Sequence, residues 1–158
     1  MKAVILAGGK GTRLAPYTYV LPKPMMPIGD KAILEVLMRQ MKRAGINHVV
    51  LTVGHLAGLM QAFFQDGAQW DLDISYSFEA KPLGTAGPLA LVPNLDKAFL
   101  VTNGDVLTLL NFHDFFAFQR HINVLRVGFN RFADFDGTGH ITVLVHHQAF
   151  FQQLQIGR

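Results

Sequence analysis

The first residues that could do chemistry are the loop GGKGTR, residues 8–13, which directly follows a short apolar run. Successive glycines allow backbone N–H groups to close around a phosphate, while Thr12 adds a hydroxyl and Arg13 adds a forked cation. Ten residues after Arg13, Lys23 stands between two prolines. Because proline fixes its own φ angle, the flanking prolines preorganise the backbone that carries this lysine. The loop is therefore a candidate for phosphate binding.

Two common phosphate-binding loops do not fit these residues. A dinucleotide fingerprint that starts at Gly9 needs a glycine at the place of Leu14. A P-loop needs serine or threonine directly after its lysine, whereas Gly11 follows Lys10. The glycines alone fit a plain turn between a strand and its crossover equally well. On residue types alone, both interpretations of the loop stay open.

The composition indicates a folded domain rather than a disordered or membrane-spanning chain. Half of the 158 residues are hydrophobic and only 16% are charged, whereas disordered segments are poor in apolar residues. No apolar run approaches the ~18 residues of a membrane span, and the first residues lack the basic-then-apolar pattern of a signal peptide. The chain has no cysteine, which excludes disulfides and thiolate metal sites. We therefore expect a cytoplasmic protein without a membrane partner.

The charge pattern argues against nucleic acid as a partner. The formal net charge is +3, but the fourteen Lys and Arg residues are scattered, and Lys42–Arg43 is their only adjacent pair. Nucleic-acid-binding domains usually gather such residues in a stripe on one face. A different partner is therefore expected.

Four short apolar runs predict buried strands. They cover residues 2–7, 48–53, 73–78 and 98–102. In the third run apolar residues alternate with polar ones, which is typical of a strand covered on one face. Because helical segments separate these runs, we predict an α/β fold with a mostly parallel central sheet and helices on both faces. Ligands of such folds bind at the carboxyl ends of the strands, where the glycine loop and the turn at 103–105 belong.

Cap and stop residues set the predicted helix ends. Asp30 is expected to cap a helix that ends at Gly45, with apolar residues recurring every three or four positions. A second helix is predicted over residues 56–66 and is closed by Gly67. Thr85 is expected to cap a short third helix.

The composition changes after about residue 110. Nine of the 13 phenylalanines and five of the seven histidines lie from Phe112 onward. No lysine follows Lys97 and no glutamate follows Glu79. The elements expected beyond this point are a helix at 112–121, strands near 124–129 and 140–146, and a final short helix.

Four separate stretches carry a resemblance to a known family. They read LAGGKGTRL (6–14), PKPMMPI (22–28), EAKPLGTAGPL (79–89) and VTNGDVLT (101–108). In this order and at this spacing they resemble the sugar-nucleotidyltransferases, also called nucleotide-sugar pyrophosphorylases. Within that family, their residues are most similar to those of mannose-1-phosphate guanylyltransferases. The resemblance implies a three-layer Rossmann-like nucleotidyltransferase fold. It assigns residues 1–112 to a nucleotide-binding core and leaves 113–158 as an atypical remainder, which we expect to pack on the same domain.

The resemblance also implies a reaction. An oxygen of a sugar 1-phosphate attacks the α-phosphorus of a nucleoside triphosphate, which yields a nucleotide-sugar and pyrophosphate without a covalent enzyme intermediate. Catalysis would consist of positioning and of charge neutralisation on the phosphates, with Mg²⁺ as the cofactor. The expected partners are therefore a nucleoside triphosphate and a sugar 1-phosphate, with mannose 1-phosphate favoured.

Particular residues take roles from the same resemblance. Arg13 would help pyrophosphate to leave, Lys23 would stabilise the transition state at the α-phosphate, and Asp105 would hold Mg²⁺. A solvated loop lysine and a turn aspartate are the alternatives for the last two. Octahedral Mg²⁺ takes only one or two protein carboxylates, so one aspartate is informative. The implied nucleotide-binding set is Leu6, Ala7, Gly8, Gly9, Gly11, Thr12, Arg13, Lys23, Glu79, Pro82, Gly84 and Asp105.

The nucleobase would be read near Glu79. Pro82 and Gly84 match the family's loop against the base, and the residue three before that proline commonly reads the base edge. An ionised carboxylate only accepts hydrogen bonds, and guanine offers two adjacent donors where uracil and thymine offer one. This favours GTP, with a solvated acid at a strand end as the alternative for Glu79.

The resemblance ends after VTNGDVLT. Family members continue with a half that binds the sugar phosphate and supplies a second metal-binding aspartate, and no segment of that kind follows here. The chain is then a truncated or altered transferase, a compact variant completed by another subunit, or a silent nucleotide-binding relative with a regulatory or scaffold role. Apolar surface left by a missing half could drive assembly of a homo-oligomer.

Overall fold

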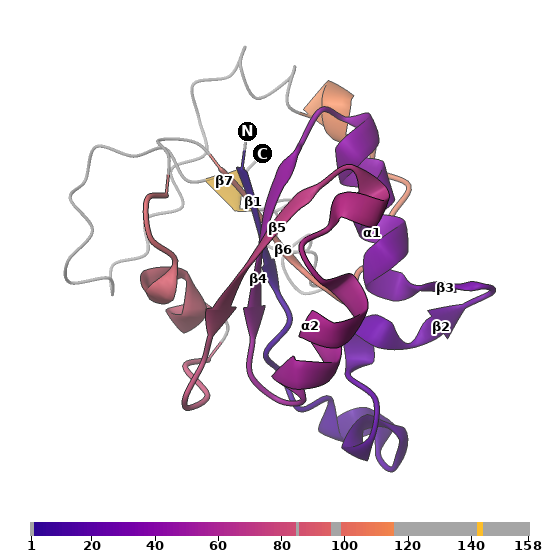
Figure 1. Cartoon of the computed structure of the whole chain (residues 1–158), viewed down its shortest axis with the longest axis vertical. Helices are drawn as coiled ribbons and strands as arrows, with labels where there is room; N and C mark the ends of the chain where they lie inside the picture. The colour runs from indigo at the N-terminus through magenta and orange to yellow at the C-terminus, as the bar shows by residue number, and fades with distance from the viewer. Residues whose placement is uncertain (1, 85, 96–98, 116–141, 144–158) are drawn as a thin grey trace, which may run out of the picture.

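The computed structural model of the chain describes residues 2–84, 86–95, 99–115 and 142–143. A five-stranded sheet runs in the order β5-β4-β1-β6-β7, and every neighbouring pair in it is parallel (Figure 1). The predicted α/β fold with a mostly parallel sheet is therefore confirmed. The strands are β1 (Lys2–Leu6), β4 (His48–Val53), β5 (Asp73–Phe78), β6 (Phe99–Asn103) and β7 (Thr142–Val143).

Strand β1 lies at the centre of the sheet because its residues are apolar on both faces. Val4 pairs with Val50 on one side and with Val101 on the other, and all three are at most 4% exposed. Helices α1 (Ile33–Arg43) and α2 (Ala57–Phe64) pack on one face of the sheet. The short 3₁₀ helix η5 (Gly87–Leu91) contributes to the smaller core on the other face. This two-sided burial is typical of parallel sheets.

The start of α1 differs from the prediction. Asp30 does not cap the helix, because residues 27–32 form a small hairpin of β2 (Pro27–Ile28) and β3 (Lys31–Ala32) before it. The residue that flanks α1 is Ala32, which makes no capping hydrogen bond with its side chain. Asp30 instead accepts a hydrogen bond of 2.5 Å from Lys31, which lowers the pKa of its carboxyl.

The other helix ends are close to the predictions. Gly45, with φ 84°, follows α1, and its N–H donates to the carbonyl of Lys42, so the predicted stop is confirmed. Helix α2 is shorter than predicted, because the chain leaves it at Gln65, which has φ 44°. Gly67 then begins the 3₁₀ turn η4 (Ala68–Trp70).

Strand β5 departs from its predicted alternation at its carboxyl end. Ile74 is buried as expected, but Phe78 is 53% exposed while Ser77 is buried. The reason is that β5 is an outer strand of the described sheet and η5 packs against it. At the carboxyl end of β5, the face that carries Ser77 is therefore covered, whereas the face that carries Phe78 is open to solvent.

Most elements predicted beyond residue 110 lie outside the described residues. Within them, residues 112–115 are helical, where the helix at 112–121 was expected to begin. Strand β7 falls inside the strand expected near 140–146 and pairs with β6. Thr85, the strand near 124–129 and the final helix cannot be compared. No described helix is long and apolar enough to cross a membrane.

Candidate functional site

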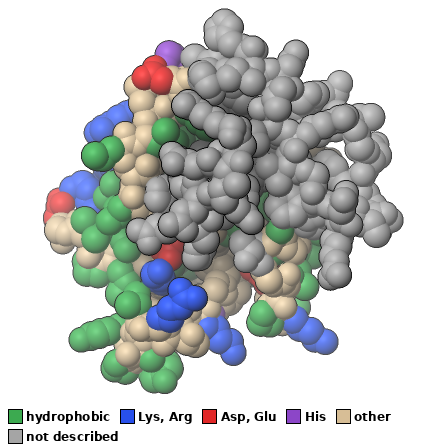
Figure 2. All heavy atoms as spheres, turned by 180° about the vertical axis from the view of Figure 1, so that it is seen from behind, with side chains coloured by type: hydrophobic (Ala, Val, Ile, Leu, Met, Phe, Trp, Pro, Cys, Tyr) green, Lys and Arg blue, Asp and Glu red, His purple; other side chains and the backbone are tan. Residues whose placement is uncertain are grey.

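A cleft of about 670 Å³ opens where β1, β5 and β6 end. The strands point their carboxyl ends to the lower part of the molecule in Figure 1, and several Lys and Arg side chains lie close together at the lower end of the back face (Figure 2). This is the position at which parallel α/β sheets bind ligands. The cleft is lined by Leu6, Ala7, Gly8, Gly9, Lys10, Gly11, Thr12, Arg13, Leu14, Lys23, Pro24, Glu79, Pro82, Gly84, Pro88, Asn103 and Asp105.

All twelve residues of the predicted nucleotide-binding set line this cleft. They come from four segments: the loop after β1, the turn at Lys23, the loop after β5 and the end of β6. The five further lining residues were not predicted. All five lie inside the stretches that carried the resemblance, so the predicted residues next to them in sequence were the available signal. Leu14 and Pro24 directly follow predicted cationic residues.

The wall of the cleft at Gly8 is closed by the carboxylate of Glu79. A Cβ atom added to Gly8 would lie 2.1 Å from Glu79 Oε1, so only glycine permits this approach. The N–H of Leu83 donates to Glu79 Oε2 at 3.3 Å, and the N–H of Glu79 donates to the Val53 carbonyl at 2.8 Å. The carboxylate is therefore held at the cleft wall by the loop that follows β5.

The glycine loop ends in a tight turn that presents Thr12 and Arg13. Gly11 has φ 61°, and the N–H of Leu14 donates to its carbonyl at 2.9 Å. These contacts start the 3₁₀ helix η1 (Thr12–Leu14). Thr12 and Arg13 are exposed and line the cleft, so a hydroxyl and a guanidinium are both available to a ligand.

Lys23 and Asp105 meet in the cleft as an ion pair. Lys23 begins the 3₁₀ helix η3 (Lys23–Met25), whose next residue, Pro24, is buried. Asp105 follows Gly104, whose N–H donates to the Leu6 carbonyl at 2.9 Å and so ties this turn to β1. The side chains are 39% and 28% exposed, so both charges remain accessible to a ligand.

The charges around the cleft suit a polyanion with a metal ion. Lys10, Arg13 and Lys23 supply three cations, and Glu79 and Asp105 supply two carboxylates. Among the described residues, no group of three or more His, Asp or Glu could hold a metal by itself. Mg²⁺ that is shared with phosphates needs only one or two protein carboxylates, and Asp105 can provide one.

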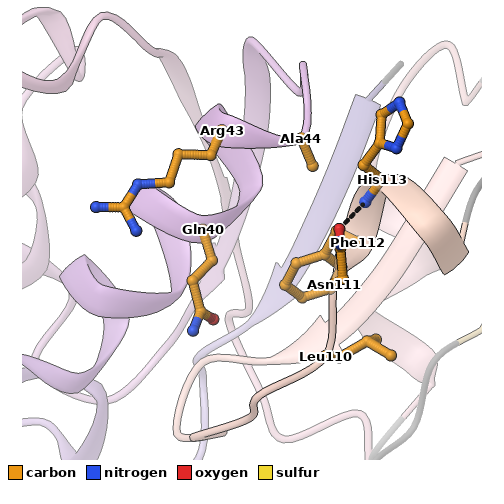
Figure 3. A pocket seen from close by; sticks show the side chains of 7 residues that line it. All are labelled: Gln40, Arg43, Ala44, Leu110, Asn111, Phe112 and His113. Atoms are coloured by element: carbon orange, nitrogen blue, oxygen red, sulfur yellow. Dashed lines mark hydrogen bonds between the residues drawn. The ribbon is translucent and has the colours of Figure 1, made fainter.

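A second, smaller pocket of about 170 Å³ lies between α1 and the segment around Phe112 (Figure 3). Two of the polar side chains that line it are already engaged in hydrogen bonds. The amide of Gln40 donates to the Thr108 carbonyl at 2.9 Å, and the Asn111 side chain accepts from the N–H of His113. The guanidinium of Arg43 points away from the other lining side chains (Figure 3). We assign no chemistry to this pocket.

Comparison with known proteins places the cleft in a family. The sequence pattern of the nucleotidyl transferase family matches residues 2–127. The UTP–glucose-1-phosphate uridylyltransferase of Synechocystis sp. is 40% identical over 120 residues, which cover 68% of this chain and 31% of that protein. The mannose-1-phosphate guanyltransferase beta-B of Xenopus laevis is 39% identical over 126 residues, with coverage of 77% and 35%.

A solved structure has the same fold. HddC from Yersinia pseudotuberculosis, complexed with GMP-PN, superposes with a TM-score of 0.63 at 29% identity, over 75% of this chain and 53% of that chain. The chain spans about a third of the length of the curated relatives described above. The family match nevertheless includes every residue that lines the cleft. The chain therefore belongs to the nucleotidyl transferase family.

Proposed function

We propose that this chain carries the nucleotide-binding part of a sugar-1-phosphate nucleotidyltransferase. Such an enzyme transfers a nucleoside monophosphate from a nucleoside triphosphate to a sugar 1-phosphate and releases pyrophosphate. The observation that carries the proposal is the convergence of four distant segments, with all twelve predicted residues, around one cleft. The names of the relatives and the family match support the same reaction class.

The roles of the residues follow from where charge develops in this reaction. The backbone at Gly11, with the side chains of Thr12 and Arg13, would bind the β- and γ-phosphates, and Arg13 would stabilise the departing pyrophosphate. Lys23 would neutralise the α-phosphate as the sugar phosphate oxygen attacks it. Mg²⁺ bound at Asp105 would supply further neutralisation of the phosphate charge. No side chain needs to form a covalent bond.

We further propose that the base is guanine and the acceptor mannose 1-phosphate. The carboxylate of Glu79 lies at the cleft wall, where it can accept hydrogen bonds from N1–H and the 2-amino group of guanine. The guanyltransferase relative supports this choice, while the uridylyltransferase relative keeps UTP as the competing base.

Residues 1–112 would then form the nucleotide-binding core, with the remainder on the same domain. The pairing of β7 with β6 supports this arrangement. Because the chain spans about a third of its curated relatives, a second candidate function is a nucleotide-binding regulatory or scaffold subunit without turnover. The two functions differ in pyrophosphate release and agree in nucleotide binding.

The deciding experiment measures pyrophosphate release from GTP and Mg²⁺, with and without mannose 1-phosphate. We expect sugar-dependent release by the wild type and a loss of at least about 100-fold in Lys23→Ala. Lys31→Ala is the matched control, because Lys31 pairs with Asp30 outside the cleft. Mg²⁺-dependent GTP binding by calorimetry without release would support the regulatory subunit. Neither binding nor release would refute both functions.

A further inference from the structure

His55 lies outside the cleft and forms hydrogen bonds with two separate segments of the chain. Its ring Nε2 lies 2.9 Å from the carbonyl oxygen of Thr18. A carbonyl only accepts hydrogen bonds, so Nε2 carries the hydrogen and donates it. The backbone N–H of His55 also donates to the carbonyl of Gly8, at 3.3 Å. His55, which follows β4, therefore connects the start of the glycine loop to the turn that contains Thr18.

Thr18 continues this connection to the end of the loop. It is 1% exposed, and its hydroxyl donates to the Gly11 carbonyl at 3.0 Å. Its methyl carbon would lie 2.8 Å from a Cβ atom on Gly11, so the side chain packs directly on that glycine. Thr18 thus holds Gly11 in the left-handed conformation from which the turn carrying Thr12 and Arg13 begins.

We propose that His55 and Thr18 are positioning residues for triphosphate binding. The ring of His55 fixes the Thr18 carbonyl, and the hydroxyl of Thr18 fixes the Gly11 carbonyl. Neither residue lines the cleft, so both act through the loop rather than on the ligand. This inference rests on the proposed function, because it assigns the loop a triphosphate ligand.

The energetic benefit is preorganisation of the loop. Donors that already face a phosphate need no rearrangement when it binds, whereas a mobile loop must first be ordered at an entropic cost. The ring of His55 bonds to the Thr18 carbonyl, and the Thr18 hydroxyl bonds to Gly11, which lies on the side of the loop assigned to the β- and γ-phosphates. Loss of these bonds should therefore weaken the binding of a nucleoside triphosphate and leave the binding of a nucleoside monophosphate largely unchanged.

The test compares the affinities of GTP and GMP, each with Mg²⁺, by calorimetry. In His55→Phe and Thr18→Val we expect GTP affinity to fall about tenfold and GMP affinity to change less than about twofold. His55→Gln and Thr18→Ser keep a donor at each place and should recover most of the GTP affinity. Equal losses for both nucleotides, or no loss for either, would overturn the positioning role.

A second readout separates this inference from the proposed function. The N–H groups of Leu14 and Ala15 donate to the carbonyls of Gly11 and Thr12, so they report on the order of this turn. Their amide hydrogen exchange in the free protein should be faster in His55→Phe than in the wild type, and His55→Gln should restore protection. A wild type that binds no nucleoside triphosphate would refute the proposed function. Unchanged exchange in His55→Phe would refute the positioning role whether or not nucleotides bind.

Discussion

Lys23 and Asp105, which come from η3 and from the turn after β6, neutralise each other across the cleft. In the proposed reaction each has another partner, the α-phosphate for Lys23 and Mg²⁺ for Asp105. Binding of the metal and nucleotide would therefore exchange one ion pair for two new interactions. Because both side chains are partly exposed, the existing pair is screened by water and is weak enough to be replaced.

Removing Lys23 should increase the affinity of the cleft for a divalent cation. Lys23→Met frees Asp105 from its competing cation, so we expect Mn²⁺, used as a probe without nucleotide, to bind up to about fivefold more tightly. Mn²⁺ titration followed by electron paramagnetic resonance measures this. Arg13→Met is the matched control, because Arg13 also lines the cleft but forms no ion pair among the described residues. Equal effects of the two changes would show that the pair itself does not compete with the metal.

Glu79 should determine the choice of base. In Glu79→Gln the side chain offers one acceptor and one donor group in place of two acceptors, so we expect the preference for GTP over UTP to fall by about tenfold. Pyrophosphate release with each nucleotide gives the ratio. Asp73→Asn removes a carboxylate at the opposite end of the same strand and should leave the ratio unchanged. A wild type that uses GTP and UTP equally would contradict the assignment.

Gly8→Ala should destabilise the fold through a contact with one named side chain. The added Cβ would lie 2.1 Å from Glu79 Oε1, so the carboxylate must move and its bond from the Leu83 N–H is lost. Because the carboxylate is the end of a flexible side chain, the cost is mainly that of the lost hydrogen bond, and we expect the free energy of unfolding to fall by about 0.5–1.5 kcal/mol. Gly9→Ala is the control, because its Cβ meets no atom within 4 Å. Urea unfolding measures both, and equal stabilities of the two variants would argue against the close approach.

Tyr76 should make stability depend on alkaline pH. Burial, with a smaller contribution from Asp66, raises the pKa of Tyr76 to about 12 from 10.0. The folded protein thus holds this proton more tightly than the unfolded chain, so the stabilisation is complete below pH 10 and is lost as the pH rises toward 12. Melting temperatures of Tyr76→Phe should fall less steeply over this range than those of the wild type. Tyr17→Phe changes a tyrosine that is 69% exposed and should retain the steep wild-type fall.

The sheet was predictable because its strands are buried on both faces. A short continuous apolar run such as that of β4 marks a parallel strand whatever its neighbours are. The cap at Asp30 and the alternation at Phe78 failed because each depends on tertiary neighbours. A hairpin occupies the residues after Asp30, and η5 packs against the outer strand that carries Phe78.

The cleft residues were predictable from four sequence stretches, but the relations between them were not. Spacing along the chain does not reveal that Lys23 meets Asp105 or that Glu79 touches Gly8. His55 and Thr18 gave no signal, because a histidine after a strand and a threonine in a loop are ordinary residues at ordinary places. Only the fold brings them to the back of the glycine loop.

The central place of β1 has a consequence for the nascent chain. One edge of β1 pairs with β4, while the other waits for β6, which the ribosome delivers some 90 residues later, since β1 ends at Leu6 and β6 begins at Phe99. Until then the chain exposes an unpaired apolar strand edge, which is a template for aggregation. In the folded protein β6 closes that edge, and the turn that follows β6 carries Asp105 to Lys23. The strand that covers the exposed edge of β1 is thus also the strand that completes the cleft.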